Sequence, residues 1–559
     1  MPARRAQFAV KLLPSLTDIA FIMPILFLFG KMDGVKTLLS DCDTGWHIRT
    51  GEWILAHHQV PVHDIFSFSK PNSVWYAWEW LTDILFASLY SHGGLRTIVL
   101  FAMLLISLTF VLLFRLVRRK SNAIIAVVVT MIAAAASSIH WLARPHLFTM
   151  LFLVLFYGAL ENVRAGKTRL GPIPYLAILP FATILWTNLH GGFFVGAVLI
   201  AAYGAGELLK IALTTDVEQR APAWIRARNY GLSSLACVAA SLANPYTWHL
   251  HQHVLEYLRD PYQSQHIMEF LSISFHHPIA IFFESMLLAG VAAAVWDMAK
   301  GRYTEAVVIV VWGHAALLAA RNIPLFMIVA APVVAAAMEE WVALMPGWNV
   351  AGWVRQAAGR FGRVAQDTSE TDRIARWHVV SIAAALIFGA VLFAPNPPKS
   401  FRAEFDPESY PAGAVNLLRK VPEARIFAHD QWGDYLIYRL YPRTKVFMDG
   451  RSDFYGPDFE KKNYQAVLNV NYDWEQTLNR FHVDTVLLPP SAPLAGALKE
   501  SAHWRVVYDD HVALVFRSTQ TTAGETVSFT GSGDGKNRGR EVTNTQARDQ
   551  AITELKSKT

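Results

Sequence analysis

Long apolar runs, separated by short polar segments, follow one another from about residue 19 to residue 394. Most of them approach the roughly 20 residues that a helix needs to cross the hydrocarbon core of a membrane. The pattern predicts an α-helical polytopic membrane protein with about eleven transmembrane helices. We expect these helices over residues 19–30, 95–117, 123–139, 147–160, 173–186, 193–213, 230–242, 279–296, 306–320, 325–344 and 379–393.

The pattern changes after residue 394, where the membrane domain 1–394 is expected to end. Short apolar runs at 424–428, 444–448, 484–488, 504–508 and 512–516 predict strands, with helices between them at 433–440, 464–480 and 494–499. This alternation predicts a small α/β domain over residues 395–518, with a partly parallel sheet. Residues 519–559 are polar and rich in Gly, Ser, Thr and charges, so we expect a disordered tail.

Basic residues indicate how the chain is threaded. Arg4, Arg5 and Lys11 precede the first run, and later Lys and Arg clusters follow every second run. Since such clusters mark the cytoplasmic side, the N-terminus is expected in the cytoplasm, with residues 39–80 and the C-terminal domain outside. Charged residues make up 17% of the 559 residues, against about 25% in soluble domains. The net charge of +6 therefore sets orientation, and we expect no nucleic-acid partner.

The first outer loop, residues 39–80, has unusual chemistry at its start. Asp41, Asp43 and His47 lie within seven residues of one another, directly after the first apolar run. One interpretation is that an aspartate caps a helix that begins near Gly45. The other is that Asp43, oriented by His47 or Asp41, acts as a general base, or that Asp41 and Asp43 bind a divalent cation. We favour the second, because a cap needs only one of them.

Further polar residues lie where runs emerge on the same side. Glu79 closes the loop beside tryptophans, where solvation in the headgroup layer is the alternative explanation. Arg144, His146, His190 and Arg321 follow at outward helix ends. An arginine there can simply extend its side chain to the headgroups. It can also bind a phosphate or pyrophosphate, which guanidinium matches with two hydrogen bonds, and Arg321 is the strongest candidate.

These residues resemble a known family. The first outer loop with its acids, the many spans and the C-terminal outer domain resemble the GT-C superfamily of membrane glycosyltransferases, which includes oligosaccharyltransferases. A largely uncharacterised bacterial group of GT-C-like proteins is more similar still, over about residues 18–518. The motifs that carry the resemblance are residues 41–55, Val60-Pro61, Asp64, Phe66-Ser67-Phe68, Glu79-Trp80-Leu81, Arg144-Pro145-His146, Asn188-Leu189-His190-Gly191-Gly192, Asn244-Pro245-Tyr246, Gly433-Asp434-Tyr435-Leu436 and Asp449-Gly450-Arg451.

The resemblance implies a membrane glycosyltransferase that uses a polyprenyl phosphate- or pyrophosphate-linked sugar at the outer face of a bacterial inner membrane. The partners would be membrane lipid, this donor, and a glycan, lipid or protein acceptor. Asp43 would match the first-loop acid that deprotonates the acceptor or binds a metal such as Mg or Mn, and Arg321 would contact the lipid phosphate. The sequence departs from oligosaccharyltransferases because it has no well-defined second acidic site. The metal requirement and the acceptor therefore stay open.

Two other functions remain as alternatives. A non-catalytic binder or transporter of lipid-linked glycans would keep the same scaffold, but a transporter needs charged residues deep inside its spans. Few are present, namely Glu207, Glu284 and His314. The third possibility is a structural partner in an envelope assembly, with the C-terminal domain as its interaction surface.

Overall fold

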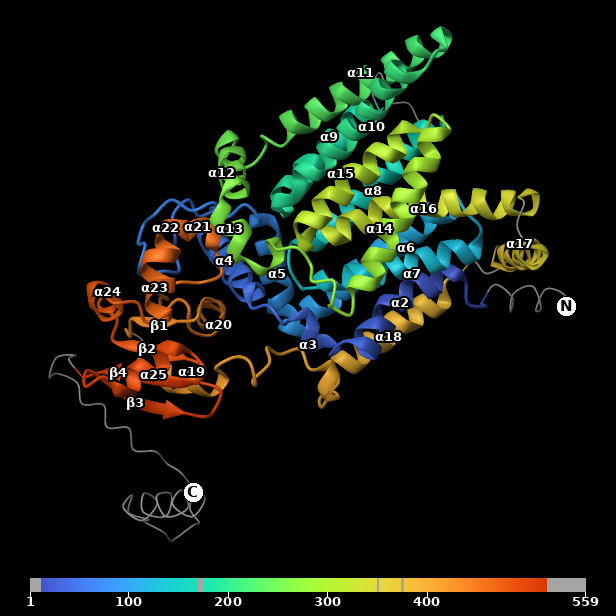
Figure 1. Cartoon of the computed structure of the whole chain (residues 1–559). Helices are drawn as coiled ribbons and strands as arrows, with labels where there is room; N and C mark the ends of the chain where they lie inside the picture. The colour runs from blue at the N-terminus through green and yellow to red at the C-terminus, as the bar shows by residue number, and fades with distance from the viewer. Residues whose placement is uncertain (1–11, 168–173, 349–350, 373–376, 422, 520–559) are drawn as a thin grey trace, which may run out of the picture. The chain divides into compact units, whose positions relative to one another are not determined.

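The computed structural model describes residues 12–167, 174–348, 351–372, 377–421 and 423–519. Apart from Thr519, the tail expected to be disordered lies outside these residues. The first 392 residues are helical wherever regular structure is assigned (Figure 1). The α-helices of this part are α2 (Leu16–Lys31), α3 (Val35–Leu38), α4 (Asp43–His57), α5 (Trp80–Gly93), α6 (Leu95–Arg118), α7 (Ala123–Ser137), α8 (His146–Arg164), α9 (Pro174–Leu189), α10 (Phe194–Leu213), α11 (Val217–Ala240), α12 (Trp248–Arg259), α13 (Pro261–His266), α14 (Ala280–Ala299), α15 (Tyr303–Leu318), α16 (Ile323–Leu344), α17 (Gly352–Asp372) and α18 (Val379–Leu392).

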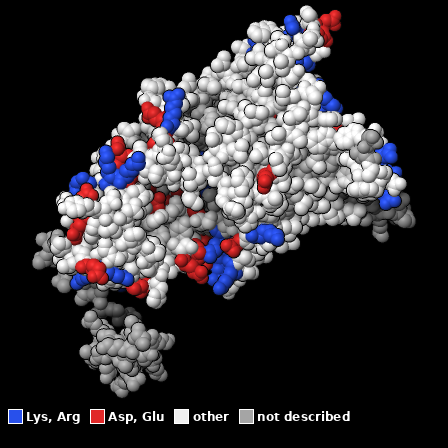
Figure 2. Space-filling model, viewed as in Figure 1, with Lys and Arg blue, Asp and Glu red and all other residues white. Residues whose placement is uncertain are grey.

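Helices that can cross a membrane dominate this part of the chain. Within the described ranges, six are long and apolar enough to do so: Leu95–Arg118, Ala123–His140, His146–Arg164, Gly191–Leu213, Ala280–Ala299 and Ala320–Gly347. Three shorter apolar helices cover Ile178–Leu189, Tyr303–Leu318 and Val379–Leu392. The polytopic helical architecture agrees with the sequence, whereas the count of eleven spans is not confirmed. In the view of Figure 2, charged side chains are sparse over the helical part and gather at its margins and over the C-terminal part.

Small residues let the central helices approach one another. α16 packs against α7, α8, α14 and α15, and its buried face includes Ala330, Ala331 and Ala335. α10 meets α15 at Gly206, where a β-carbon would overlap Thr304. Close backbone contact of this kind gives helices in lipid their van der Waals packing, because burial of apolar surface from water is not available there.

One expected loop is helical. The apolar pattern predicts a cytoplasmic loop between the spans 193–213 and 230–242, and the basic residues of that loop are Arg220, Arg226 and Arg228. Instead, α11 runs without interruption from Val217 to Ala240, and the Asp216 carboxylate accepts the Glu218 N–H at its start. That expectation was wrong because the basic residues are compatible with a helix that extends beyond the apolar segment. Arg226 also pairs with Glu207 of α10 at 2.8 Å.

The first outer loop also contains a helix, α4, which is held between two others. α4 packs on α5 and on α20 (Asp430–Leu440) of the C-terminal part. Two glycines permit this. A β-carbon on Gly51 would overlap the Asp83 carbonyl oxygen of α5, and one on Gly45 would lie 2.7 Å from Tyr438 Cβ of α20. These contacts hold the Asp43 end of α4 against the C-terminal part.

The C-terminal part contains a four-stranded sheet. Its strands are β1 (Ile426–Ala428), β2 (Thr485–Leu488), β3 (Trp504–Asp509) and β4 (Leu514–Ser518), in the order β1-β2-β4-β3. β1 and β2 are parallel, and the other neighbours are antiparallel, which confirms the partly parallel sheet. The helices here are α19 (Ala412–Leu418), α20, α21 (Ser452–Tyr455), α22 (Pro457–Phe459), a π-helical turn (Glu460–Gln465), α23 (Ala466–Leu468), α24 (Trp474–Arg480) and α25 (Pro493–Glu500).

The expected strand at residues 444–448 is not a regular strand. Val446 makes single parallel bridges to Ile426 of β1 and to Ser67 of the first outer loop. The Val446 N–H donates to the Phe66 carbonyl and the Phe68 N–H donates to the Val446 carbonyl, both at 3.0 Å. The apolar run is therefore used at the sheet edge, where it joins residues 66–68 to the C-terminal part. Sequence periodicity cannot identify such a partner.

Candidate active site

A large cavity lies between the helical part and the C-terminal part. Its volume is about 1350 Å³. One side is apolar and comes from the ends of membrane helices, with Ile139, Met150, Val195, Val198, Val311 and Leu325 among its residues. The other side is polar and comes from α4, from the segments around Arg144 and Glu269, and from residues 429–431, 448–453 and 460–465. The cavity can therefore accommodate an amphipathic molecule.

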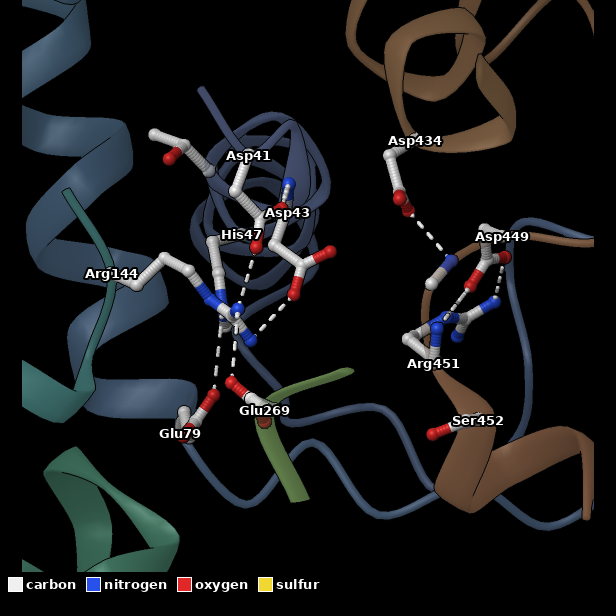
Figure 3. A network of polar contacts seen from close by, with 12 residues as sticks. Asp41, Asp43, His47, Glu79, Arg144, Glu269, Asp434, Asp449, Arg451 and Ser452 are labelled. Carbon is white, nitrogen blue, oxygen red and sulfur yellow. Dashed lines mark hydrogen bonds and ion pairs between the residues drawn. The ribbon is translucent and has the colours of Figure 1, made fainter. Parts of the chain in front are cut away.

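A cluster of charges occupies the polar side. The guanidinium of Arg144 binds two carboxylates, with Nη1 at 2.6 Å from Asp41 Oδ2 and Nη2 at 2.6 Å from Asp43 Oδ2 (Figure 3). Nη1 also lies 4.0 Å from Glu269 Oε2. The other oxygen of Glu269 is 3.0 Å from Arg321 Nη1. Four chain segments thus bring two arginines and three acids together.

Asp41 and Asp43 have different local roles at the start of α4. The Asp43 N–H donates to Asp41 Oδ1 at 2.9 Å. Asp41 therefore satisfies a backbone donor at the helix start, although the N-cap itself is Cys42, which makes no side-chain cap. The Asp43 carboxylate makes no such bond and contacts Arg144 instead. The capping interpretation thus describes Asp41 in part, while the general-base or cation-binding role of Asp43 stays a prediction.

A second cluster of polar side chains surrounds His47 and Glu79. His47 Nδ1 is 2.6 Å from Asp83 Oδ1, and His47 Nε2 is 3.5 Å from Glu79 Oε2. His190 Nε2 is 3.4 Å from Glu79 Oε1, and its Nδ1 is 2.7 Å from Thr149 Oγ1. His47 is only 1% exposed and does not line the cavity, whereas Glu79 and His190 do. His47 therefore connects α4 to α5.

Burial shifts the acid–base equilibria in the cavity. It raises the pKa of Asp43 to about 8, although Arg144 opposes the shift. Burial likewise raises the pKa of Glu79 to about 8, again opposed by Arg144. Burial would also raise the pKa of Glu269, but Arg321 and Arg144 outweigh it and lower that pKa to about 2. For His47, burial and Arg144 lower the pKa well below its usual value, so the ring is neutral.

A further acid, Asp434 of α20, faces Asp43. Oδ1 of Asp43 and Oδ2 of Asp434 are buried and have no hydrogen-bond partner among the described residues. The indole N–H of Trp46 approaches Asp43 without completing a hydrogen bond. A β-carbon on Gly450 would lie 2.7 Å from one of these oxygens and 2.8 Å from the other. Burial, and then Asp43, raise the pKa of Asp434 well above its usual value.

A buried ion pair supports this wall of the cavity. Arg451 Nη2 lies 2.7 Å from Asp449 Oδ2 and 2.8 Å from Asp64 Oδ1 of the first outer loop. Its guanidinium also lies 4.4 Å from the centre of the Trp75 ring. Figure 3 shows this pair next to Asp434, whose carboxylate accepts the Gly450 N–H at 2.9 Å. The outer loop and the C-terminal part are therefore held together beside Asp43.

The structure places nearly all the predicted residues around one cavity. Its lining includes Asp41, Asp43, Glu79, Arg144, His146, His190 and Arg321. His146 is the least available for a ligand, since its Nε2 lies 2.7 Å from the His140 carbonyl oxygen and its ring packs on His140. Sequence reasoning missed Glu269 and Asp434 as site residues. Asp434 had a signal in the Gly433-Asp434-Tyr435-Leu436 motif, whereas Glu269 had none beyond its position in an outer loop.

The donor set does not fit a divalent cation in this arrangement. Within the part of the chain that the structure describes, no group of three or more His, Cys, Asp or Glu residues could hold a metal ion. The guanidinium of Arg144 engages one oxygen of Asp41 and one of Asp43, the two residues we expected to bind the cation.

Comparisons with known proteins identify the fold. No protein-family model matches the chain, and no curated protein matches its sequence. Among solved structures, it is similar to the archaeal oligosaccharyltransferase AglB of Archaeoglobus fulgidus in complex with an inhibitory peptide and a dolichol-phosphate. The TM-score is 0.51 at 13% identity, over 90% of this chain and 74% of that one.

A second structure of the oligosaccharyltransferase from the same organism, in complex with Zn and sulfate, is also similar. It gives a TM-score of 0.51 at 12% identity, over 90% of this chain and 73% of that one. Likeness at this identity establishes the fold and leaves the activity open. The fold expected from the motifs is therefore confirmed, since the chain is similar in fold to the oligosaccharyltransferase of Archaeoglobus fulgidus.

Proposed function

We propose that the protein is a GT-C-type membrane glycosyltransferase. It would transfer a sugar from a polyprenyl phosphate- or pyrophosphate-linked donor to an acceptor at the outer face of a bacterial inner membrane. The observation that carries this proposal is the convergence of Asp43, Arg144 and Arg321 on one cavity with an apolar side. The oligosaccharyltransferase fold supports it, as does the dolichol-phosphate bound to AglB.

In this mechanism Asp43 is the general base. A nucleophilic atom of the acceptor attacks the anomeric carbon of the donor, the bond from that carbon to the phosphate oxygen breaks, and Asp43 takes the proton of the acceptor. The raised pKa of Asp43 makes its ionised form a stronger base. Arg144 orients the carboxylate through Oδ2. Asp41 helps by holding the other side of the same guanidinium.

Arg321 binds the leaving phosphate. Its guanidinium is linked to Glu269 and lies 4.6 Å from the centre of the Phe270 ring, so its position is defined before substrate binds. Preorganised positive charge stabilises a developing phosphate anion more than flexible charge does. The polyprenyl chain would lie along the apolar side of the cavity, in contact with membrane lipid. Glu79 and His190, on the polar side, would contact the sugar.

The deciding experiment measures turnover and binding separately. The purified full-length protein is incubated with a panel of polyprenyl-phosphate-linked sugars, and the release of polyprenyl phosphate is followed by chromatography. We expect Asp43→Asn to reduce turnover about 100-fold or more, in line with the loss of a general base. Binding of polyprenyl phosphate should stay unchanged. Asp33→Asn, at an exposed acid just before the loop, is the matched control.

Three outcomes would contradict the proposal. Full turnover in Asp43→Asn would remove Asp43 from the reaction. Tight binding of polyprenyl phosphate without turnover of any donor in the panel would instead favour the non-catalytic binder or transporter. Failure to bind polyprenyl phosphate at all would leave the envelope-assembly role as the better explanation.

A further inference from the structure

The acids around Arg144 have almost no oxygen left for another ligand. Asp41 Oδ1 accepts the Asp43 N–H, and Asp41 Oδ2 accepts from Arg144. Asp43 Oδ2 contacts Arg144 as well. Glu269 Oε1 is paired with Arg321, and its Oε2 faces Arg144. The Glu269 Oε2 contact is long, at 4.0 Å, and of the six carboxylate oxygens in this cluster only Asp43 Oδ1 makes none of these contacts.

That last oxygen is poorly placed for a metal. It is buried and shares its surroundings with Asp434 Oδ2, on the side of Gly450. The adjacent Gly450 N–H is a donor and cannot ligate a cation. Mg²⁺ requires six oxygen ligands, Ca²⁺ six to eight and Zn²⁺ usually four. Two oxygens in a closed space do not provide such a shell.

Arg144 is held in its position by the backbone on both sides. It lies between the short 3₁₀ turn at Ser138–His140 and the start of α8 at His146. The preceding Ala143 N–H donates to the Leu38 carbonyl at 2.8 Å, and Pro145 follows directly. The guanidinium therefore remains where the three carboxylates converge. A divalent ion placed there would meet a fixed positive charge at contact distance, which repels it.

We infer that the Arg144 guanidinium takes the place of a divalent cation, so that the site works without a metal ion. Arg144 then does by hydrogen bonding what a metal would do by coordination: it neutralises Asp41 and Asp43 and fixes the orientation of the Asp43 carboxylate. The statement that Arg144 orients a general base rests on the proposed function. The statement that the site binds no divalent cation does not depend on it. One structure of the Archaeoglobus oligosaccharyltransferase, in contrast, is a complex with Zn and sulfate.

The test measures Mn²⁺ binding to the purified full-length protein without any sugar donor, by electron paramagnetic resonance and calorimetry. We expect no stoichiometric Mn²⁺ site in the natural protein. Arg144→Ala frees one oxygen each of Asp41, Asp43 and Glu269, and should gain about one Mn²⁺ per chain. The gain should disappear when Asp43→Asn is added. Arg144→Lys, which keeps the positive charge, should bind none.

Two results would overturn the inference. One is a stoichiometric Mn²⁺ site in the natural protein, whatever the variants do. The other is an Arg144→Ala protein that folds and still binds no Mn²⁺, because then the arginine is not what excludes the cation. Arg144→Gln, which is closer in size, replaces the alanine variant if that one does not fold. Since no donor is present, these results are independent of whether the protein transfers a sugar.

Discussion

At the scale of single residues, the acids of the cavity differ in environment. Asp41 satisfies a backbone donor, Asp43 combines an arginine contact with a buried oxygen, and Glu269 is held ionised by two arginines. Glu79 is buried between two neutral histidines, and burial raises its pKa although Arg144 and a hydrogen bond from the Gly191 backbone oppose the shift. Its protonated form is therefore favoured at neutral pH, which makes the stability of the protein depend on pH.

We expect the ionisation of Glu79 to lower the melting temperature as pH rises from about 5 to about 8. The folded protein keeps a proton on Glu79, whose pKa is raised to about 8, while an unfolded chain loses it near the ordinary value of 4.5. The folded state binds more protons across this window, so its free energy of unfolding decreases with pH. Asp43 acts in the same direction.

Glu79→Gln isolates the contribution of Glu79. This variant carries no titrating group at position 79. Its melting temperature should therefore fall by about 2–4 °C less than that of the natural protein over the same pH interval. Thermal unfolding followed by tryptophan fluorescence at several pH values measures the change. Glu500→Gln, at an exposed position in α25, is the control and should leave the slope unchanged. An equal slope in the Glu79 variant would show that Glu79 is ionised in the folded protein.

At the scale of elements, the site depends on how closely α4 approaches α5. Gly51 has no room for a side chain, because a β-carbon there would overlap the Asp83 carbonyl oxygen. Asp83 in turn holds His47 of α4. The spacing of the two helices thus determines where the Asp43 end of α4 lies.

Gly51→Ala should separate α4 from α5 and destabilise the protein by about 1–3 kcal/mol, as overpacking does in other tightly packed interiors. Turnover should fall as well, because Asp43 moves with α4. Gly158→Ala in α8 is the matched control, since nothing lies within 4 Å of its added carbon. That change should be neutral or slightly stabilising. Melting temperatures and turnover of the two variants test this, and equal behaviour would refute the close-packing argument.

The elements around the site also show how much of the structure can be predicted from the sequence. The apolar runs and the Asp43, Arg144 and Arg321 motifs were sufficient to predict a polytopic helical protein and several polar residues that line one cavity. Periodicity was not sufficient for α11, whose basic half has no apolar signal, or for Val446, whose partner is far away in the chain. Glu269 and Asp434 were missed for a related reason. Their chemistry comes from neighbours that only the folded chain supplies.

At the scale of the whole molecule, residues 12–519 join two kinds of structure across the cavity. Asp64 of the outer loop and Arg451 of the C-terminal part form a buried pair, and Val446 bridges to Ser67 next to it. The helical part supplies the apolar wall, and the C-terminal part supplies Asp434 and Gly450 beside Asp43. If the helical part lies in a membrane, the C-terminal part and the cavity must share one side of it.

The proposed function requires that this side is the outer one, and labelling of single cysteines can test the requirement. The cysteines of the chain, Cys42 and Cys237, are both buried, so an added one reports its own location. Tyr472→Cys places a thiol on the C-terminal part at a fully exposed position. Arg360→Cys places one on α17, which the basic residues predict to be cytoplasmic.

A membrane-impermeant maleimide should label Tyr472→Cys in intact spheroplasts and Arg360→Cys only after permeabilisation. The reverse pattern would put Asp43 and its cavity on the cytoplasmic side, where the proposed donor is not used, and would refute the outer-face mechanism. Because α17 and the C-terminal part are separated by α18, whose 14 residues form a single apolar helix, labelling of both from outside would also show that α18 does not cross the membrane. The side of the membrane from which position 472 is labelled therefore decides on which side Asp43 can act.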